Sequence, residues 1–457
     1  MQEKRHNKMA DTPIVKLLIS MSLPAMFSMF IQAMYNIVDS IYVAMIGENA
    51  LTAVSLAFPV QNLIIAVAVG TGVGLNSLIS RRLGERRQDQ ADKAATHGLV
   101  IAICGWLLFL VFGLFFTRLF FAAFTNDPTI LEMGVDYTAI VTIFSIGCFV
   151  EISLEKTLQA TGNMIWPMVF QLSGAVTNII LDPIFIFGWF GLPAMGVTGA
   201  AIATVLGQIL SMFLAIAVIV LREHAVTVSL RSFRPEAAVF RDIFAVGLPA
   251  IIMQAIGSVM IMGLNSILIA LSSTAVAVLG VYFKLQSFVM MPVFGLGQGA
   301  LPIMGYNYGA RNRSRLMKTL KMEGIFATII MVIGTLLFFF IPETLLGLFS
   351  ASPDMLAIGI PALKIIGLCF PFSAWGISIS NFFQAVGSGV NSLVISLMRQ
   401  LICILPLAWI FSRTLGLQAV WFAFPLAEMV SMVTSLLLLY RVYRNQVANL
   451  ESFADEE

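Results

Sequence analysis

Two acidic residues inside long apolar segments are the side chains best suited to do chemistry. Asp39 lies in segment 14–45, and Asp182 lies in segment 164–187. An ionisable group inside a membrane span costs about 2.5–3.5 kcal/mol on insertion scales and usually has a function. Asp39 precedes Met45 by six residues, which places it roughly 9 Å inside the end of its segment. The two acids are therefore the first candidates for binding a proton or a metal cation.

Other polar groups accompany the acids at a similar depth. Asn178 and Asp182 are four residues apart, so they share one helix face. Pro183 removes a backbone hydrogen bond and frees the carbonyl near Ile179. Tyr137 lies at a comparable depth in segment 131–154. Carboxylates, an amide and a free carbonyl suit either a sodium ion or a carboxyl group that binds a proton.

The segments that carry these residues are typical of membrane spans. Apolar residues make up 59% of the 457 positions and charged residues only 11%, whereas a soluble domain carries about 25% charged residues. A bilayer core needs roughly 20 apolar residues per helix. We predict an all-α integral membrane protein with twelve transmembrane helices, at 14–45, 52–80, 94–118, 131–154, 164–187, 196–221, 239–268, 274–303, 318–341, 355–378, 391–412 and 416–441.

An internal repeat divides the chain into halves. Ser22-Leu23-Pro24 recurs as Gly247-Leu248-Pro249, and this offset of 249 − 24 = 225 also maps Gly74 on Gly299. Each half holds six spans, so we predict two six-helix lobes related by a parallel pseudo-two-fold axis. The predicted boundaries are 1–221 for the N-lobe, 222–238 for a cytoplasmic linker and 239–457 for the C-lobe.

The repeat also bears on the role of the acids. An alternative interpretation is that Asp39 and Asp182 are structural carboxylates satisfied by neighbours. Their counterparts at the same offset are Leu264 and Leu407. Because the other half accepts leucine at both places, the architecture does not require an acid there, and the repeat favours a functional role.

Lysine and arginine gather in alternate loops. The opposite loops carry only Arg118 and Arg413. Because positive charge marks the cytoplasmic side, we predict a multi-pass plasma membrane protein with both termini in the cytoplasm. The basic residues that carry this prediction are Lys4, Arg5, Lys8, Lys16, Arg81, Arg82, Arg86, Arg87, Lys93, Arg222, Arg231, Arg234, Arg241, Arg311, Arg313, Arg315, Lys318, Lys321, Arg441 and Arg444.

Further charges lie in or near spans. Lys284 and Glu428 are near mid-depth, and they either line a central cavity or neutralise each other or Lys364. Arg399 belongs to the same half. Three more charged residues, near the cytoplasmic end of the fourth span, are interpreted as an interfacial cluster: Glu151, Glu155 and Lys156.

The motifs of common enzymes are missing from the sequence. There is no P-loop lysine motif or other nucleotide-binding pattern. We therefore predict a protein that is not an enzyme and needs no cofactor beyond a coupling ion, H⁺ or Na⁺. Nucleic acid is not an expected partner; the lipid bilayer and small organic cations are.

The chain resembles the multidrug and toxic compound extrusion (MATE) family along essentially its whole length. The order and spacing of several motifs carry the resemblance: Ser22-Leu23-Pro24, Asp39 with Ile41-Tyr42-Val43, Gly72-Val73-Gly74, Gln159-Ala160-Thr161-Gly162-Asn163, Asn178 to Pro183, Gly196 to Thr204, Pro292 to Gly299 and Tyr306 to Ala310.

The resemblance implies a V-shaped fold of two lobes and a monomeric multidrug efflux antiporter of the bacterial inner membrane. It would export organic cations from the cytoplasm by alternating access, in exchange for H⁺ or Na⁺. Asp39, Asn178 and Asp182 would form the cation-coupling site, and would be the metal ligands if the ion is Na⁺. The side chains that we assign to substrate binding are Gln32, Tyr35, Asn36, Tyr137, Gln254, Lys284 and Glu428.

The C-lobe departs from one branch of that family, which also uses acids there. The seventh span offers Gln254, and the tenth offers Asn381 but no acid. We therefore predict the branch that is coupled through its N-lobe. Two alternatives stay open: a flippase for a lipid-linked oligosaccharide, which would need a strongly cationic cavity, and a channel, for which no filter-like loop is visible.

Overall fold

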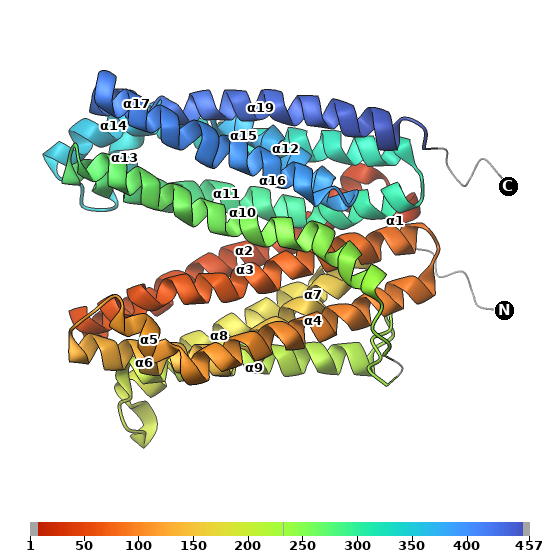
Figure 1. Cartoon of the computed structure of the whole chain (residues 1–457), viewed down its shortest axis with the longest axis horizontal. Coiled ribbons are helices and arrows are strands. Elements are labelled where there is room, and N and C mark those ends of the chain that lie inside the picture. Colours follow the sequence, from red (N-terminus) through yellow and green to blue (C-terminus); the bar gives the residue numbers. More distant parts are fainter. Residues whose placement is uncertain (1–7, 232, 451–457) are drawn as a thin grey trace. The chain divides into compact units, whose positions relative to one another are not determined.

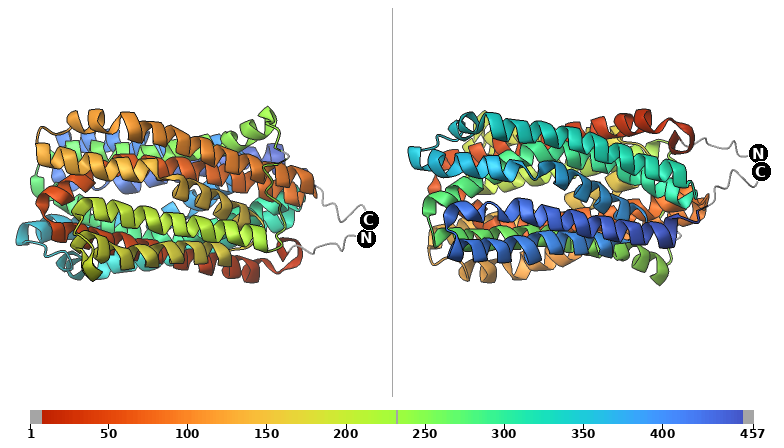
Figure 2. Two further views of the ribbon diagram at one scale, coloured as in Figure 1. Left: turned by 90° about the horizontal axis from the view of Figure 1, so that it is seen from below. Right: turned by 90° about the horizontal axis from the view of Figure 1, so that it is seen from above.

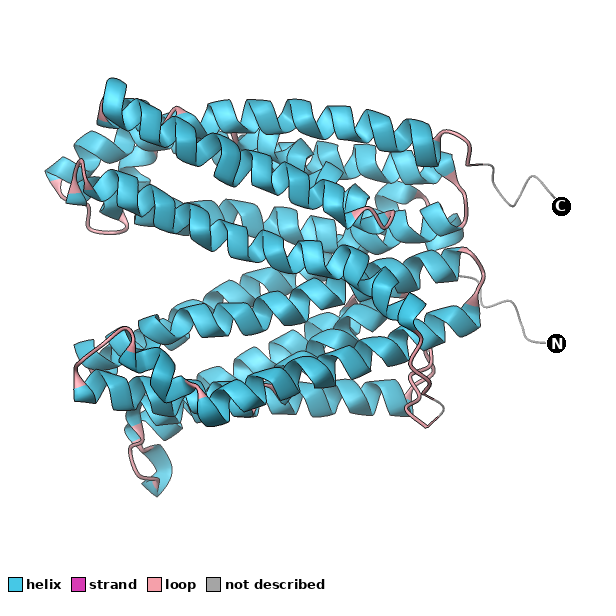
Figure 3. Cartoon of the chain, viewed as in Figure 1, coloured by secondary structure: helices cyan, strands magenta, loops and turns pink. Residues whose placement is uncertain are grey.

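The computed structural model describes residues 8–231 and 233–450, and all regular structure in them is helical (Figure 3). Ten helices or continuous helical runs are long and apolar enough to cross a membrane, and two bent helix pairs raise the number to as many as twelve in the described part. The prediction of an all-helical protein of about twelve spans is therefore confirmed. The long helices are α2 (Ile14–Ile46), α3 (Glu48–Gly84), α4 (Gln88–Phe115), α8 (Ile165–Phe187), α9 (Gly196–Leu221), α10 (Ala237–Ile269), α11 (Ser273–Gly309), α12 (Arg313–Phe340) and α19 (Ala423–Val442).

The two bent pairs occupy equivalent places in the repeat. Helices α6 (Pro128–Ile143) and α7 (Ile146–Ala160) meet at 42°, and α14 (Pro353–Gly367) and α15 (Phe370–Ala385) meet at 49°. Adding 225 to the bounds of the first pair gives 353 and 385, the bounds of the second. The fourth and tenth predicted spans are thus each broken at the same point.

The eleventh span shows an irregularity that its counterpart lacks. It runs from α16 (Gly389–Leu397) through a π-helical segment, η2 (Met398–Ile404), into α17 (Leu405–Thr414). The counterpart, α8, is α-helical throughout. Short π-helical segments often occur at functional sites.

The described chain forms two compact units. Unit 1 comprises Phe27–Leu83 and Arg87–Ile251, and unit 2 comprises 8–26, Gly84–Arg86 and 252–450. In each unit the long helices follow roughly one direction (Figures 1 and 2). The lobe boundaries predicted from the sequence describe the repeat and stay a prediction. The units differ from those lobes because the N-terminal part of α2, up to Met26, belongs to unit 2, and the N-terminal part of α10, up to Ile251, belongs to unit 1.

Glycines make this exchange possible. A Cβ atom on Gly74 of α3 would collide with the Ile243 carbonyl oxygen of α10. At the equivalent position in unit 2, a Cβ on Gly299 of α11 would collide with Ser22 of α2. The pairs correspond because Ser22 and Gly247, like Gly74 and Gly299, are 225 residues apart. Close backbone approach at glycine is a common way to pack membrane helices.

Candidate cation-binding site

Two of the predicted coupling residues, Asn178 and Asp182, lie on α8, which packs closely against α9 in unit 1 (Figure 1). A Cβ on Gly199 of α9 would lie 2.5 Å from the Phe185 carbonyl oxygen of α8, and one on Gly207 would lie 2.8 Å from the Gly174 carbonyl oxygen. Both glycines therefore allow the backbones of α8 and α9 to approach closely. This approach brings Thr204 of α9 against Asn178 of α8.

Asn178 connects the two helices. Its side chain is buried, at 2% exposure. In the amide orientation that satisfies all partners, its nitrogen donates to Asp182 Oδ2 (2.9 Å) and its oxygen accepts from Thr204 Oγ1 (3.2 Å) and the Thr204 backbone N–H (3.1 Å). The amide orientation is assigned from these partners. Asn178 thus supports Asp182, and Thr204 is a member of the site that the sequence analysis did not assign.

Asp39 and Asp182 contact each other through their carboxyl groups, from α2 and α8 of unit 1. Asp182 is fully buried, at 0% exposure, and Asp39 is half-buried. The Oδ1 atom of each is buried and has no hydrogen-bond partner among the described residues. Two ionised carboxylates in a poorly solvated place repel each other, so the contact is favourable only with a proton or a cation present.

Two tyrosines flank the carboxyl pair. Tyr137 is 2% exposed and accepts a hydrogen bond from Gln61 Nε2 of α3 (2.7 Å). Tyr35, half-buried, is one helical turn before Asp39 and interacts electrostatically with it. The sequence analysis missed Gln61. The amide pair Gln61-Asn62 in an apolar span was the available signal, and it did not show which residue Gln61 contacts.

The other predicted substrate-binding residues differ in exposure. Gln32 and Asn36 of unit 1 are exposed, as are Gln254 and Lys284 of unit 2. Glu428 is instead 9% exposed. The structure therefore gathers Tyr35 and Tyr137 around the acids and leaves four side chains on the surfaces of their units. Their assignment to substrate stays a prediction.

Glu428 was predicted to bind substrate, and the structure places it in an ion pair with an arginine of unit 2. Glu428 Oε1 of α19 lies 3.6 Å from Arg399 Nη1 of the π-helical segment. Lys284 Nζ lies 5.8 Å from the centre of the Phe349 ring, and Lys364 Nζ lies 5.5 Å from the Phe339 ring. Arg399 therefore neutralises Glu428, a pairing that differs from the predicted ones with Lys284 or Lys364.

The cluster expected at the membrane interface is buried inside unit 1. Glu151, Glu155 and Lys156 of α7 are 9%, 2% and 5% exposed. Lys156 Nζ lies 3.1 Å from Glu155 Oε1, which also accepts from Gln159 Nε2 (2.7 Å). Because protein groups supply its partners, this network is part of the interior of the unit.

Together, the described spans and the carboxyl groups that meet among them define a polytopic membrane protein with an acidic pair inside one unit. Comparison with known proteins identifies its family. The MatE family model matches residues 24–184 and 249–410, so the chain belongs to the MatE family. The two matched segments begin 225 residues apart, which agrees with the repeat.

Relatives match along nearly the full length. The multidrug export protein MepA of Staphylococcus aureus is 24% identical over 430 residues, which cover 94% of both chains. A solved structure described as the outward-facing conformation of a multidrug resistance MATE family transporter of the MOP superfamily is 28% identical. It has a TM-score of 0.90 and covers 97% of this chain and 99% of its own. The chain is therefore a membrane transporter and not an enzyme.

A third relative differs in its description. A MOP superfamily transporter from Pyrococcus furiosus is 28% identical, with a TM-score of 0.89 and coverage of 97% of this chain and 99% of its own. Its structure is described as having a binding pocket of reverse polarity, which suggests a different function for that protein.

Proposed function

We propose that this transporter exports organic cations from the cytoplasm and is driven by H⁺ or Na⁺ that binds at the Asp39–Asp182 pair. The observation that carries the proposal is the contact of these carboxyl groups inside one unit. Relatives described as multidrug exporters support the drug substrate. Because the repeat places Leu264 and Leu407 at the equivalent positions, the acids are not needed for folding this architecture.

The chemistry follows from charge. When a proton or Na⁺ binds the pair, repulsion between the carboxylates is relieved and α2 packs against α8. When the ion leaves, the two negative charges repel and the packing of α2 changes. Coupling requires that the drug be carried by the ion-free state and released on ion binding. A cation that moves inward down the membrane potential releases about 2.3 kcal/mol per elementary charge per 100 mV. This free energy can drive the drug outward.

Asn178 and Thr204 have a positioning role in this mechanism. The Asn178 amide holds Asp182 Oδ2, and Thr204 holds the Asn178 oxygen. Asp182 therefore keeps one geometry while Asp39, on another helix, moves toward it or away from it. This asymmetry makes Asp39 the mobile member of the pair.

The test is transport by the purified protein in proteoliposomes. Efflux of a fluorescent cation is followed with a Na⁺ gradient and a pH gradient imposed separately. Accumulation that depends on one gradient and is lost in Asp39→Asn identifies the ion and the site. Transport at the wild-type rate in Asp39→Asn would exclude this pair as the coupling site.

The flippase alternative is less well supported by the charges of unit 2. A pyrophosphate-linked substrate would need several cationic side chains free to bind it. Arg399 is paired with Glu428, and Lys284 and Lys364 lie over phenylalanine rings. A lipid-flipping assay on the same proteoliposomes separates the two functions.

We also propose that both termini face the cytoplasm, from the distribution of basic residues given above. Lys4 and Arg5 lie outside the described residues. Reporter fusions at the two ends and in the loop that contains Arg118 test this orientation. Cytoplasmic reporter activity at both ends and none at the loop is expected.

A further inference from the structure

Unit 2 contains a buried carboxyl group for which the mechanism above has no role. Glu323 of α12 is 1% exposed. Its Oε1 atom accepts one hydrogen bond from Asn381 Nδ2 of α15 (2.7 Å). Its Oε2 atom is buried and has no partner in the part of the chain that the structure describes. The carboxyl group therefore lacks the second partner that an ionised form would need.

Among the described residues, Glu323 forms no ion pair with a positively charged side chain. Its hydrogen-bond partner there, Asn381, is neutral. Burying an ionised carboxylate without a counter-charge is costly, and such groups normally become neutral instead. Glu323 must therefore carry a proton or a bound cation whenever unit 2 has this packing.

The surroundings favour the proton. Hard metal cations require several oxygen ligands, and the described residues contain no group of three or more acidic, histidine or cysteine side chains that could hold a metal. A Cβ on Gly297 of α11 would collide with Asn381 Nδ2, so the amide is packed tightly against that helix. One carboxyl group and one amide suffice for a proton.

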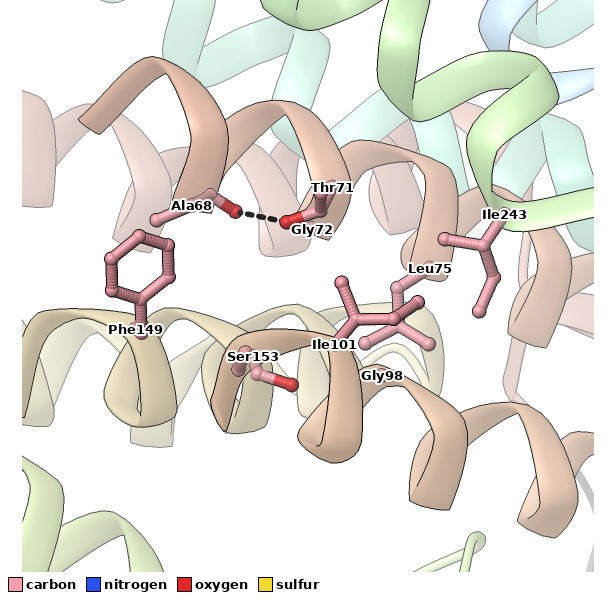
Figure 4. Close-up of a pocket in the computed structure, with 10 residues that line it drawn as sticks. Ala68, Thr71, Gly72, Leu75, Gly98, Ile101, Phe149, Ser153 and Ile243 are labelled. Atoms are coloured by element: carbon pink, nitrogen blue, oxygen red, sulfur yellow. Dashed lines mark hydrogen bonds between the residues drawn. The ribbon is translucent and has the colours of Figure 1, made fainter. Parts of the chain in front are cut away.

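The equivalent place in unit 1 is constructed differently. Subtracting 225 gives Gly98 for Glu323, Lys156 for Asn381 and Gly72 for Gly297. Leu75 fills the space beside Gly98, next to a cavity of about 10 Å³ (Figure 4). The positive charge of Lys156 is balanced by Glu155 at 3.1 Å.

This difference bears on whether Glu323 has only a structural role. Since one copy of the architecture accepts a glycine at this position, the helix packing does not require the acid. The lysine of unit 1 has a counter-charge, whereas the carboxyl group of unit 2 has none in the described part of the chain.

We propose that Glu323, hydrogen-bonded to Asn381, is a second proton-binding site of the transporter, in unit 2, which gains and loses its proton during the transport cycle. The proposal rests on the proposed function, because a proton-binding group contributes to transport only in a cation-driven protein. It adds a protonation step in the half of the chain for which the sequence analysis predicted no cation site. When Glu323 loses its proton, the contact between α12 and α15 must loosen to admit water.

Infrared difference spectroscopy on the purified full-length protein tests the proposal without a substrate. A protonated carboxyl group has a C=O stretching band, which disappears when the pH is raised and the group ionises. We expect this band loss in the wild type and a smaller one in Glu323→Gln, whose side-chain oxygen can still accept from Asn381. Glu343→Gln, the same change at an exposed position of unit 2, should match the wild type.

A second variant keeps the carboxyl group. Asn381→Leu removes the one hydrogen bond that the described side chains donate to Glu323, so the band should shift in frequency and disappear at a higher pH than in the wild type. This comparison holds even if Glu323→Gln folds poorly. If neither variant alters the pH-dependent spectrum, Glu323 does not exchange its proton and the proposal is overturned.

Transport separates this proposal from the proposed function. Glu323→Gln should change the pH dependence of ethidium efflux in proteoliposomes, whereas Asp39→Asn should stop efflux. Full efflux by Asp39→Asn would refute the role of the unit 1 pair and leave the spectroscopic result on Glu323 intact. An effect of Glu323→Gln on Na⁺-dependent efflux with an unchanged proton spectrum would refute the assignment of a proton to Glu323.

Discussion

The two units share one architecture and differ in the charged groups that they bury. Unit 1 holds Asp39 and Asp182 where unit 2 has Leu264 and Leu407, and unit 2 holds Glu323 where unit 1 has Gly98. Leu264 is 0% exposed, so an apolar side chain fills its position well. The two units therefore share the packing of their repeated helices, while each unit carries buried acids that the other lacks.

The largest effect is expected at the carboxyl pair of unit 1. Asp39→Asn keeps the size of the side chain and removes the charge that binds the ion, so drug resistance should fall to the level of cells without the transporter. The measurement is drug susceptibility at matched expression. Asp127→Asn is the control, because Asp127 is exposed and caps α6 through Thr129 and Ile130, and asparagine also caps helices.

The next effect is expected when an acid is placed at the equivalent position of unit 2. Leu264→Asp buries a carboxyl group without the second carboxyl group that Asp182 provides for Asp39 in unit 1, because the counterpart of Asp182 is Leu407. The expected cost is about 2.5–3.5 kcal/mol. Yield in the membrane and melting temperature in detergent should both drop, with no gain in coupling. A stable variant with altered ion dependence would show that the units are interchangeable at this place.

A smaller loss is expected where the exchanged helices meet. Gly74→Ala introduces a Cβ that collides with the Ile243 carbonyl oxygen, and overpacking of this kind costs about 1–3 kcal/mol. Thermal unfolding in detergent measures the loss. Gly280→Ala is the matched control, since a Cβ there meets no atom within 4 Å. Equal melting temperatures for the two variants would contradict the close approach of α3 and α10.

Loss of the hydrogen bond between Gln61 and Tyr137 should have a moderate effect on stability. Tyr137→Phe leaves Gln61 Nε2 without its buried acceptor, at a cost of about 1–3 kcal/mol. Gln61→Leu removes the other partner, and the double variant should be less destabilised than the sum of the two. Additive losses in a thermal unfolding cycle would mean that the two side chains act independently. The counterparts in unit 2 are Gln286 and Ala362, and the alanine has no side-chain acceptor for an equivalent bond.

The smallest effect is expected at the surface of unit 1. Glu236 pairs with Lys93 at 2.7 Å, and both side chains are substantially exposed. This hydrogen bond and the positive charge of Lys93 lower the pKa of Glu236 below its usual 4.5. The stabilisation is therefore present above that pH and is lost as the pH falls. Glu236→Gln should leave the melting temperature at neutral pH nearly unchanged, because exposed pairs contribute little; a large drop would contradict this.

Much of the fold could be predicted from the sequence. Apolar runs reveal spans because a bilayer requires about 20 apolar residues in a row, and the predicted range 196–221 coincides with α9. The repeat could be recognised from its constant offset of 225 residues. The bends at α6–α7 and α14–α15 were not predicted, because an apolar pattern continues across a break in the helix axis.

Part of the candidate site could also be predicted. Asn178 and Asp182 could be placed on one face because helical spacing is a local property. A contact across helices depends on how closely they pack and on their relative rotation. Gly199 and Gly207 determine how closely α8 and α9 pack, so the contact of Thr204 with Asn178 could not be assigned in advance. The contact of Gln61 on α3 with Tyr137 on α6 likewise depends on helix packing.

Hydropathy and residue spacing are properties of the chain, so they sufficed to indicate a membrane protein, its repeated helices and the places of Asp39 and Asp182 within them. They did not identify Glu323 or the burial of Glu151 and Glu155. Which polar groups meet depends on how the helices pack: Asp39 with Asp182, Glu428 with Arg399, and Glu323 with Asn381. Polar groups buried among helices are stabilised by partners from other helices, and helix packing selects those partners.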